Sequence, residues 1–205
     1  MGDWIDATLI DPETHLVFDG IKAGSLVRAQ YTYCQGVVLG LETELASRTG
    51  AEARARHQAR VHRLVAAVDE HMATSGVIKG AGGGDGGLFA GITARYLALV
   101  ATALPGDAAD DAVARDTARA VVLASAKSAW DYRQTVNGLP VFGAFWDRDA
   151  ELPPQKSEAG EEAQFVEGAV NASQIAERDL SVQLSGWMLM EAACNVTAVT
   201  AGSQT

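Results

Sequence analysis

The sequence alternates between helical segments that carry almost no charge and helical segments that have one charged face. Charge is scarce in the segments predicted near residues 33–49, 88–104 and 178–199, whereas those near 51–74 and 108–133 are amphipathic. A helix that is apolar on all sides must be covered on all sides, but an amphipathic helix needs cover on one side only. This order predicts an all-α fold of antiparallel helical hairpins in two layers, with the charge-poor helices inside.

The amphipathic segments indicate which faces are expected to be buried. In the segment 51–74, apolar residues recur at helical spacing opposite a face rich in arginine. In the segment 108–133 we expect a second apolar stripe, with Asp110 and Asp111 among the residues that face water. The predicted stripes are Val61, Leu64, Val65, Val68 and Met72 in the first segment and Val113, Ala120, Val121 and Ala124 in the second.

We predict a single all-α domain over residues 1–205. The helical hairpin repeats about every 50 residues, and three inner helices make about half of an α/α toroid, a partial barrel. No alternating run of apolar and polar residues predicts a β-strand. An acidic, proline-rich stretch near 149–165 is expected to be a mobile loop.

The charge of the chain narrows the choice of partners. A net charge of −10 argues against nucleic acid, because phosphate binding needs clustered Lys and Arg. The N-terminal residues lack the pattern of a signal peptide, and no apolar stretch reaches the roughly 20 residues of a membrane helix. We therefore expect a cytoplasmic protein without a membrane partner.

His57, His62 and His71 lack the i, i+4 spacing of a metal site, so we expect no metal and no cofactor.

Four motifs follow one another in a fixed order. The stretch Tyr31-Thr-Tyr-Cys-Gln-Gly-Val opens the first charge-poor helix, and Gly84-Asp-Gly-Gly-Leu-Phe opens the second. Before them lies Val17-Phe-Asp-Gly, and Ser125-x-x-x-Ala-Trp falls in the second amphipathic segment. Together these motifs resemble glycoside hydrolase family 76, the endo-α-1,6-mannanases, over residues 1 to about 146.

The resemblance implies an (α/α)6 barrel that hydrolyses α-1,6-linked mannose with two carboxylates. Family members carry this pair as adjacent aspartates in the first half of the barrel, and this chain resembles the C-terminal half. We therefore expect no catalytic residue here, and an isolated chain that is inactive on α-mannan or mannooligosaccharides. The adjacent pair Asp110-Asp111 follows Pro105-Gly106 at a helix start, where acidic residues interact with the helix dipole, so we interpret it as structural.

The resemblance makes five residues candidates for substrate binding: Tyr31, Tyr33, Gln35, Asp85 and Trp146. A tyrosine offers an apolar face and a polar tip to a pyranose, whereas without the resemblance we would expect both tyrosines to cap the helical core. Asp85 could accept hydrogen bonds from mannose hydroxyls, cap the following helix, or do both. Trp146 is either an aromatic platform for a sugar or a hydrophobic plug.

The alternative function is a non-catalytic module that binds carbohydrate or associates with itself. Cys34 stands where the family motif has asparagine, and a thiol is a weaker hydrogen-bonding group than an amide. An open half-toroid also leaves apolar sides of its inner helices uncovered, which favours association. A homodimer that closes the ring is therefore a candidate assembly.

Overall fold

The computed structural model describes residues 2–152, 165–166, 169–170 and 174–202. Most of the loop predicted to be mobile, residues 153–164, lies outside the described residues. All five predicted helical segments are present, and the N-terminal residues add a short helix. The α-helices are α1 (Gly2–Thr8), α2 (Thr32–Arg48), α3 (Ala51–Ala67), α4 (Phe89–Ala103), α5 (Ala109–Asp131) and α6 (Leu180–Gly202).

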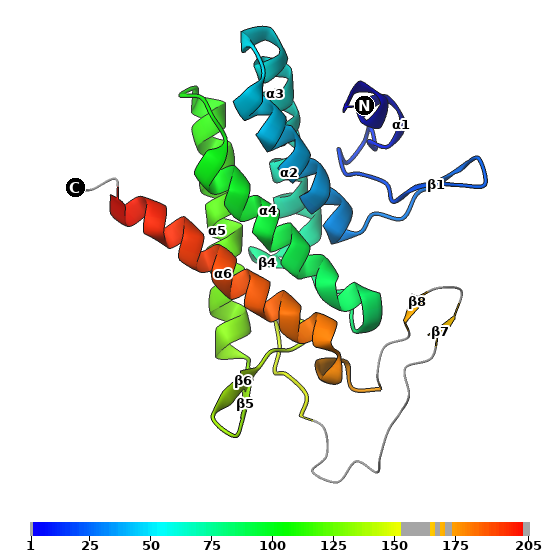
Figure 1. Ribbon diagram of the computed structural model, residues 1–205, viewed down its shortest axis with the longest axis vertical. Helices are drawn as coiled ribbons and strands as arrows, with labels where there is room; N and C mark the ends of the chain where they lie inside the picture. Colours follow the sequence, from blue (N-terminus) through cyan, green and yellow to red (C-terminus); the bar gives the residue numbers. More distant parts are fainter. Residues whose placement is uncertain (1, 153–164, 167–168, 171–173, 203–205) are drawn as a thin grey trace.

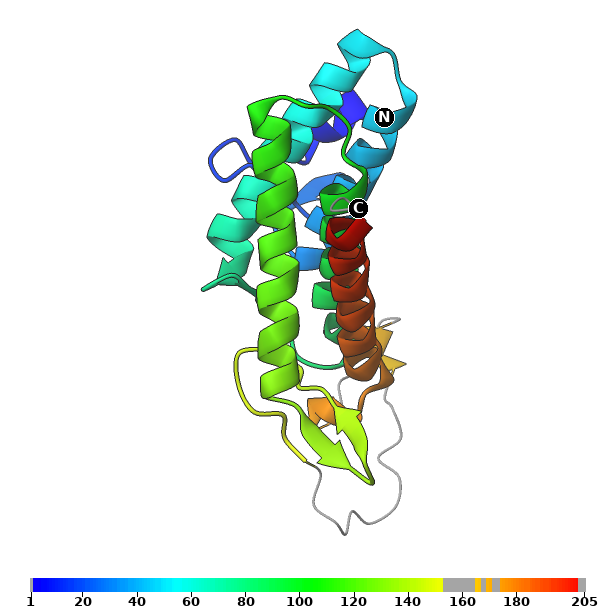
Figure 2. The same cartoon turned by 90° about the vertical axis from the view of Figure 1, so that its left-hand side faces the viewer.

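The helices form two layers (Figure 1). In the first layer α4 lies between α2 and α6, and in the second layer α3 packs on α2 while α5 packs on α4 and α6. Figure 2 shows α5 and α6 running side by side. The charge-poor helices therefore form the inner layer, and the predicted all-α fold, about half of an α/α toroid, is confirmed.

The central helix is the most apolar one. Together with the 3₁₀ turn before it, α4 is the one described helix long and apolar enough to cross a membrane, over Gly84–Ala103. It contacts α2, α5 and α6, so helices cover it on several sides. Its composition is therefore that of a core helix in the middle of the inner layer.

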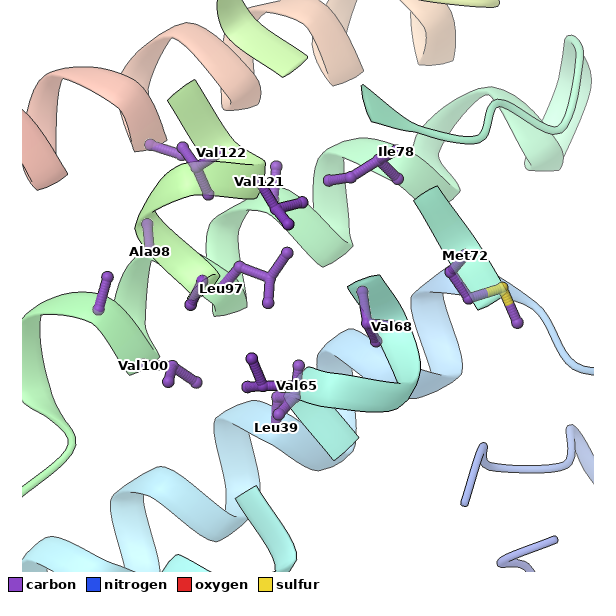
Figure 3. Packing of buried hydrophobic residues seen from close by; sticks show 14 of the residues in the cluster. Leu39, Val65, Val68, Met72, Ile78, Leu97, Ala98, Val100, Val121 and Val122 are labelled. Atoms are coloured by element: carbon purple, nitrogen blue, oxygen red, sulfur yellow. The ribbon is translucent and has the colours of Figure 1, made fainter. Parts of the chain in front are cut away.

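The hydrophobic core lies between the two layers (Figure 3). Leu39 of α2 and Leu97 of α4 are fully buried in one cluster with Val65 of α3 and Val121 of α5. Burial of each leucine stabilises the fold by about 1.5–3 kcal/mol relative to exposure. The stripe predicted in the segment 51–74 is buried throughout, although the α-helix changes to a π-helical turn at Val68–Met72.

The buried face of α5 differs from the predicted one. Val113 is 63% exposed and Ala120 is exposed, whereas Ala114, Ala118 and Asp111 are buried. The buried stripe of α5 therefore contains Ala114 and Ala118 in place of Val113 and Ala120, and the small alanine side chains let α5 approach the neighbouring helices closely.

Glycines bring the inner helices together. A Cβ atom on Gly36 of α2 would lie 2.9 Å from the Cα atom of Thr93 in α4. A Cβ atom on Gly91 of α4 would lie 2.7 Å from the Cα atom of Ser185 in α6, whose hydroxyl accepts a hydrogen bond from the Gly91 amide. Side chains at these two positions would force the inner helices apart.

The sequence shows no alternating run that predicts a strand, and the described residues contain four short two-stranded antiparallel hairpins beside the helices. Each strand has only two or three residues, too few for a visible alternation of apolar and polar residues. The pairs are β1 (Gly20–Lys22) with β2 (Ser25–Val27), β3 (Ala73–Thr74) with β4 (Val77–Ile78), β5 (Gln134–Val136) with β6 (Leu139–Val141), and β7 (Phe165–Val166) with β8 (Ala169–Val170).

Three of these hairpins turn through a residue pair that ends in glycine. Positive φ angles occur at both turn residues of Ala23-Gly24, Ser75-Gly76 and Asn137-Gly138. Two-residue type I′ turns require this backbone, and Asn-Gly is among their strongest sequence signals. The sequence therefore contained one local signal for a hairpin, at Asn137-Gly138.

Candidate functional site

The N-terminal ends of the three inner helices lie side by side (Figure 1). The amide of Gly84, in the 3₁₀ turn Gly84–Leu88 before α4, donates a 2.6 Å hydrogen bond to Oδ2 of Asp179, the residue before α6. The ring of Phe89, the first residue of α4, contacts that of Tyr31, the residue before α2. These contacts bring segments more than 50 residues apart to one end of the inner layer.

An aromatic cluster occupies this end. The ring centroids of Tyr31 and Tyr33 are 6.1 Å apart and nearly parallel. Phe89 lies 5.3 Å from the Tyr31 ring and 4.6 Å from the Tyr33 ring. Because Tyr31 is 42% exposed, the cluster presents an aromatic face with phenol groups to solvent.

An exposed carboxylate borders the cluster. The Tyr33 hydroxyl donates a 2.6 Å hydrogen bond to Oδ1 of Asp19, and the Cys34 thiol lies 3.8 Å from the same oxygen. Neither bond uses Oδ2, the second carboxylate oxygen. The hydrogen bond to Asp19, together with partial burial, raises the pKa of Tyr33 well above its ordinary value, so the phenol keeps its proton.

Gln35 is buried, and its amide is used within the protein. The side chain is 0% exposed. Its Oε1 accepts a 2.7 Å hydrogen bond from the Val17 amide, and its Nε2 donates bonds of 2.9 Å to the carbonyls of Val17 and Tyr31. The amide therefore ties the segment that precedes Asp19 to the start of α2.

Asp85 is exposed in the 3₁₀ turn before α4. Gly83 occupies the cap position of that turn, and no side chain makes a capping hydrogen bond there. Asp85 is therefore not the cap residue of this turn. Asp85 precedes Phe89 by four residues, in the 3₁₀ turn that leads into α4. Asp85 therefore joins Tyr31 and Tyr33 at the same end of the inner layer.

Trp146 lies apart from this group. It is 3% exposed and belongs to the hydrophobic core, and its carbonyl accepts a 2.7 Å hydrogen bond from the Ser128 hydroxyl of α5. A buried indole offers no platform to a sugar. Of the two interpretations of Trp146, the placement agrees with the hydrophobic plug.

Cys34 is buried beneath the tyrosines. Burial raises the pKa of its thiol, so the sulfur stays neutral and contacts Asp19 rather than solvent. A cysteine in place of the family's asparagine therefore puts a thiol, rather than an amide, next to the Asp19 carboxylate. It leaves the exposed aromatic face in place.

The aspartate pair of the chain lies at the other end of the helices. Asp111, in the first turn of α5, is 3% exposed and accepts hydrogen bonds from Gln58 at 2.9 Å and from the Ala108 amide at 3.1 Å. Its Oδ1 also lies 2.9 Å from Nε2 of His62. The 15 residues of α4 separate this end from Phe89, a length of about 22 Å. The pair therefore stabilises the start of α5, far from the aromatic cluster.

Two residues of this surface were not among the sequence candidates. Asp19 and Phe89 both lie within the recognised motifs, yet nothing in local spacing indicated that they would meet Tyr33. No group of three or more potential metal ligands occurs among the described residues. Aromatic stacking and hydrogen bonding to neutral hydroxyl groups are what this arrangement can provide.

Comparison with protein families and solved structures gives one consistent result. The model of glycosyl hydrolase family 76 matches residues 1–185. The GH76A α-1,6-mannanase from Salegentibacter sp. HEL1_6 is 28% identical with a TM-score of 0.70, and the match covers 95% of this chain and 50% of that chain. No curated protein matches.

Two further structures extend the comparison. An inactive variant of the same mannanase, with two consecutive aspartates changed to alanine and α-1,6-mannotetrose bound, is 27% identical with a TM-score of 0.69. The match covers 95% of this chain and 50% of the variant's chain. The Lin0763 protein from Listeria innocua, 23% identical with a TM-score of 0.66, shares the fold over 96% of this chain and 47% of its own. The chain thus spans about half the length of these proteins.

Proposed function

This chain belongs to glycosyl hydrolase family 76, and we propose that it supplies the sugar-binding half of an endo-acting glycosidase for α-1,6-linked mannose chains. The proposal rests on the surface where the rings of Tyr31, Tyr33 and Phe89 lie beside the Asp19 carboxylate. An aromatic face packs against the apolar face of a pyranose, and a carboxylate accepts hydrogen bonds from its hydroxyl groups.

Each residue has a distinct role in this proposal. The exposed ring of Tyr31 stacks on a mannose unit, and the oxygen of Tyr33, whose proton is held by Asp19, accepts a hydrogen bond from a sugar hydroxyl. Asp85 accepts from a second unit. Gln35 positions this surface from beneath without contacting the sugar.

We place the catalytic pair outside this chain. The mannanase variants with bound mannotetrose and mannotriose carry replacements at two consecutive aspartates. The consecutive aspartates here, Asp110 and Asp111, lie at the far end of α4 from the aromatic cluster. Hydrolysis needs one carboxylate to protonate the leaving oxygen and another to attack or stabilise the sugar cation. Those groups belong to the part of the family fold that this chain does not cover.

Incubation with α-1,6-mannotetrose tests the proposal. The chain is expected to bind the tetrasaccharide and to leave it intact, as chromatography of the sugar before and after incubation would show. Release of shorter oligosaccharides would contradict the absence of a catalytic pair, especially if Asp110→Asn or Asp85→Asn abolished it. A lack of binding would contradict the assigned surface.

A second candidate function is a stand-alone carbohydrate-binding module. The same surface favours it, because binding needs aromatic faces and hydrogen bonds but no acid pair. Addition of the half of the Salegentibacter mannanase that this chain does not match separates the two functions. Hydrolysis that appears in the mixture supports a divided glycosidase, and unchanged binding without hydrolysis supports the module.

A further inference from the structure

The short helix α1 contributes no buried side chain to the fold. Ile5 is only half-buried, and Trp4 is 52% exposed. Figure 1 shows α1 at the edge of the molecule, beside α2 and α3. A helix of seven residues is well below the roughly 12–15 residues that an isolated helix needs in water. The helical state of α1 therefore depends on its contacts with the rest of the chain.

The polar contacts of α1 converge on Arg60 of α3. Nη2 of Arg60 donates a 2.8 Å hydrogen bond to Oδ1 of Asp3, and its Nε lies 3.4 Å from Oδ1 of Asp6. The two carboxylates are three residues apart and therefore lie on the same side of α1. The hydrogen bond from Arg60 lowers the pKa of Asp3, so this carboxyl is ionised at neutral pH. One guanidinium thus binds two carboxylates of α1.

Arg60 is also held within the fold by residues outside α1. Its Nη1 lies 3.6 Å from Oε1 of Glu42 in α2, a residue that is 2% exposed. Oε2 of Glu42 lies 2.5 Å from Nδ1 of His57, which belongs to α3. A buried carboxylate needs such partners, because an unpaired charge inside a protein is strongly destabilising. These contacts join α2 to α3 whether or not α1 is in place.

The apolar packing beneath α1 leaves a gap. A cavity of about 20 Å³, enough for a single water molecule, lies between α1, α2 and α3. Ile5 of α1 lines this cavity together with Val38 of α2 and Leu64 of α3. Side chains that border a void lose part of their van der Waals contact. Apolar contacts therefore hold α1 less firmly than they hold the helices of the core.

The chain directly after α1 is anchored independently. The Leu9 carbonyl accepts a 2.8 Å hydrogen bond from the Phe18 amide, and Ile10 forms an isolated antiparallel bridge with Val17. The buried glutamine of α2 binds the amide and the carbonyl of Val17. A movement of α1 can therefore end at Leu9 without displacing the segment that leads to Asp19.

We propose that α1 is a salt-sensitive strap, closed by the contacts of Asp3 and Asp6 with Arg60, which opens about Leu9 while the helical core stays folded. The side chain of Asp3 is 87% exposed and that of Asp6 is 41% exposed. Ion pairs with such exposed partners are weak, and added salt screens them. Opening uncovers the Arg60 side chain, which is 13% exposed in the closed form, so ionic strength controls access to this charge. The inference is independent of the proposed function.

Hydrogen–deuterium exchange of the full 205-residue chain tests the strap. The amides at the C-terminal end of α1 should exchange about tenfold faster in about 1 M NaCl than in about 0.05 M NaCl, because the Debye length falls to about 3 Å. The amides of α4 should be unaffected. A double variant, Asp3→Asn with Asp6→Asn, should exchange in α1 about tenfold faster at low salt and respond little to added salt. Asp107→Asn, at an exposed loop position, is the control and should behave like the unaltered chain.

Four results would overturn the inference. The first is exchange in α1 that does not change with salt in the unaltered chain. The second is a double variant whose α1 is as protected as that of the unaltered chain, which would assign the closure to apolar contacts. The third is faster exchange in α4 together with α1, which would mean that α1 opens only when the whole chain unfolds. The fourth is faster exchange that extends through Phe18, which would contradict a hinge at Leu9.

Discussion

The hydroxyl of Tyr33 donates a 2.6 Å hydrogen bond to Oδ1 of Asp19. The two residues come from different elements, since Tyr33 lies in the first turn of α2 and Asp19 directly precedes β1. The bond holds a carboxylate beside the aromatic cluster and fixes the direction of the phenol. A hydrogen-bonding group and a stacking surface are thereby presented together, as sugar binding requires.

Asp19→Asn should weaken the binding of α-1,6-mannotetrose about fivefold to tenfold. The amide oxygen can still accept the bond from Tyr33, but hydrogen bonds to a neutral acceptor are weaker than those to a carboxylate. Isothermal titration calorimetry measures the change. Asp107→Asn, at an exposed loop position before α5, is the control and should bind like the unaltered chain. Equal affinity for both variants would remove Asp19 from the site.

The raised pKa of Tyr33 predicts a dependence of stability on alkaline pH. The native phenol keeps its proton above pH 10.0, the ordinary pKa, where the unfolded tyrosine loses it. The stabilisation by Tyr33 is therefore complete below that pH and is lost as pH rises toward the native pKa. In urea unfolding, the stability advantage of the unaltered chain over Tyr33→Phe should shrink above about pH 10. A constant difference through pH 11 would contradict the Asp19–Tyr33 bond as its source.

Gln35→Ala should lower the free energy of unfolding by about 1–3 kcal/mol, because the Val17 amide and carbonyl lose buried partners. Since Val17 precedes Asp19 by two residues, mannotetrose binding should weaken as well. Gln174→Ala, at an exposed position, is the control. Normal stability of Gln35→Ala with impaired binding would instead indicate direct contact between the amide and the sugar.

Asp111→Ala should lower the free energy of unfolding by a similar amount, about 1–3 kcal/mol, because Gln58 and the Ala108 amide lose their acceptor. Asp110 is exposed, so Asp110→Ala should change stability little. Both variants should bind mannotetrose like the unaltered chain. Loss of sugar binding in a folded Asp111→Ala variant would show that the start of α5 takes part in the site.

The charge pattern was enough to predict the helices and their two layers, because a charge-poor helix has few places to lie except inside. It was not enough to orient α5, where the fold buries Ala114 and Ala118 and exposes Val113. The hairpins escaped prediction because a strand of two or three residues has no period to detect.

Part of the site was predicted from the sequence motifs rather than from the charge pattern. Tyr31, Tyr33 and Asp85 lie in motifs that open inner helices, and the ends of those helices meet. The burial of Gln35 and Trp146 depends on contacts with residues 18 positions away in the chain, Val17 and Ser128 respectively. Such contacts leave no trace in the local spacing of residues. The sequence alone therefore could not distinguish the buried Gln35 and Trp146 from the exposed candidates.

Calorimetric titration with α-1,6-mannotetrose tests most directly whether the aromatic surface binds sugar. The unaltered chain should show saturable binding, and Tyr31→Ala should weaken it about tenfold, the equivalent of about 1.4 kcal/mol from a lost stacking surface. Trp4→Ala removes another exposed aromatic side chain, from α1, and should have no effect. Equal affinities for the unaltered chain and Tyr31→Ala, or no saturable binding by either, would contradict the account.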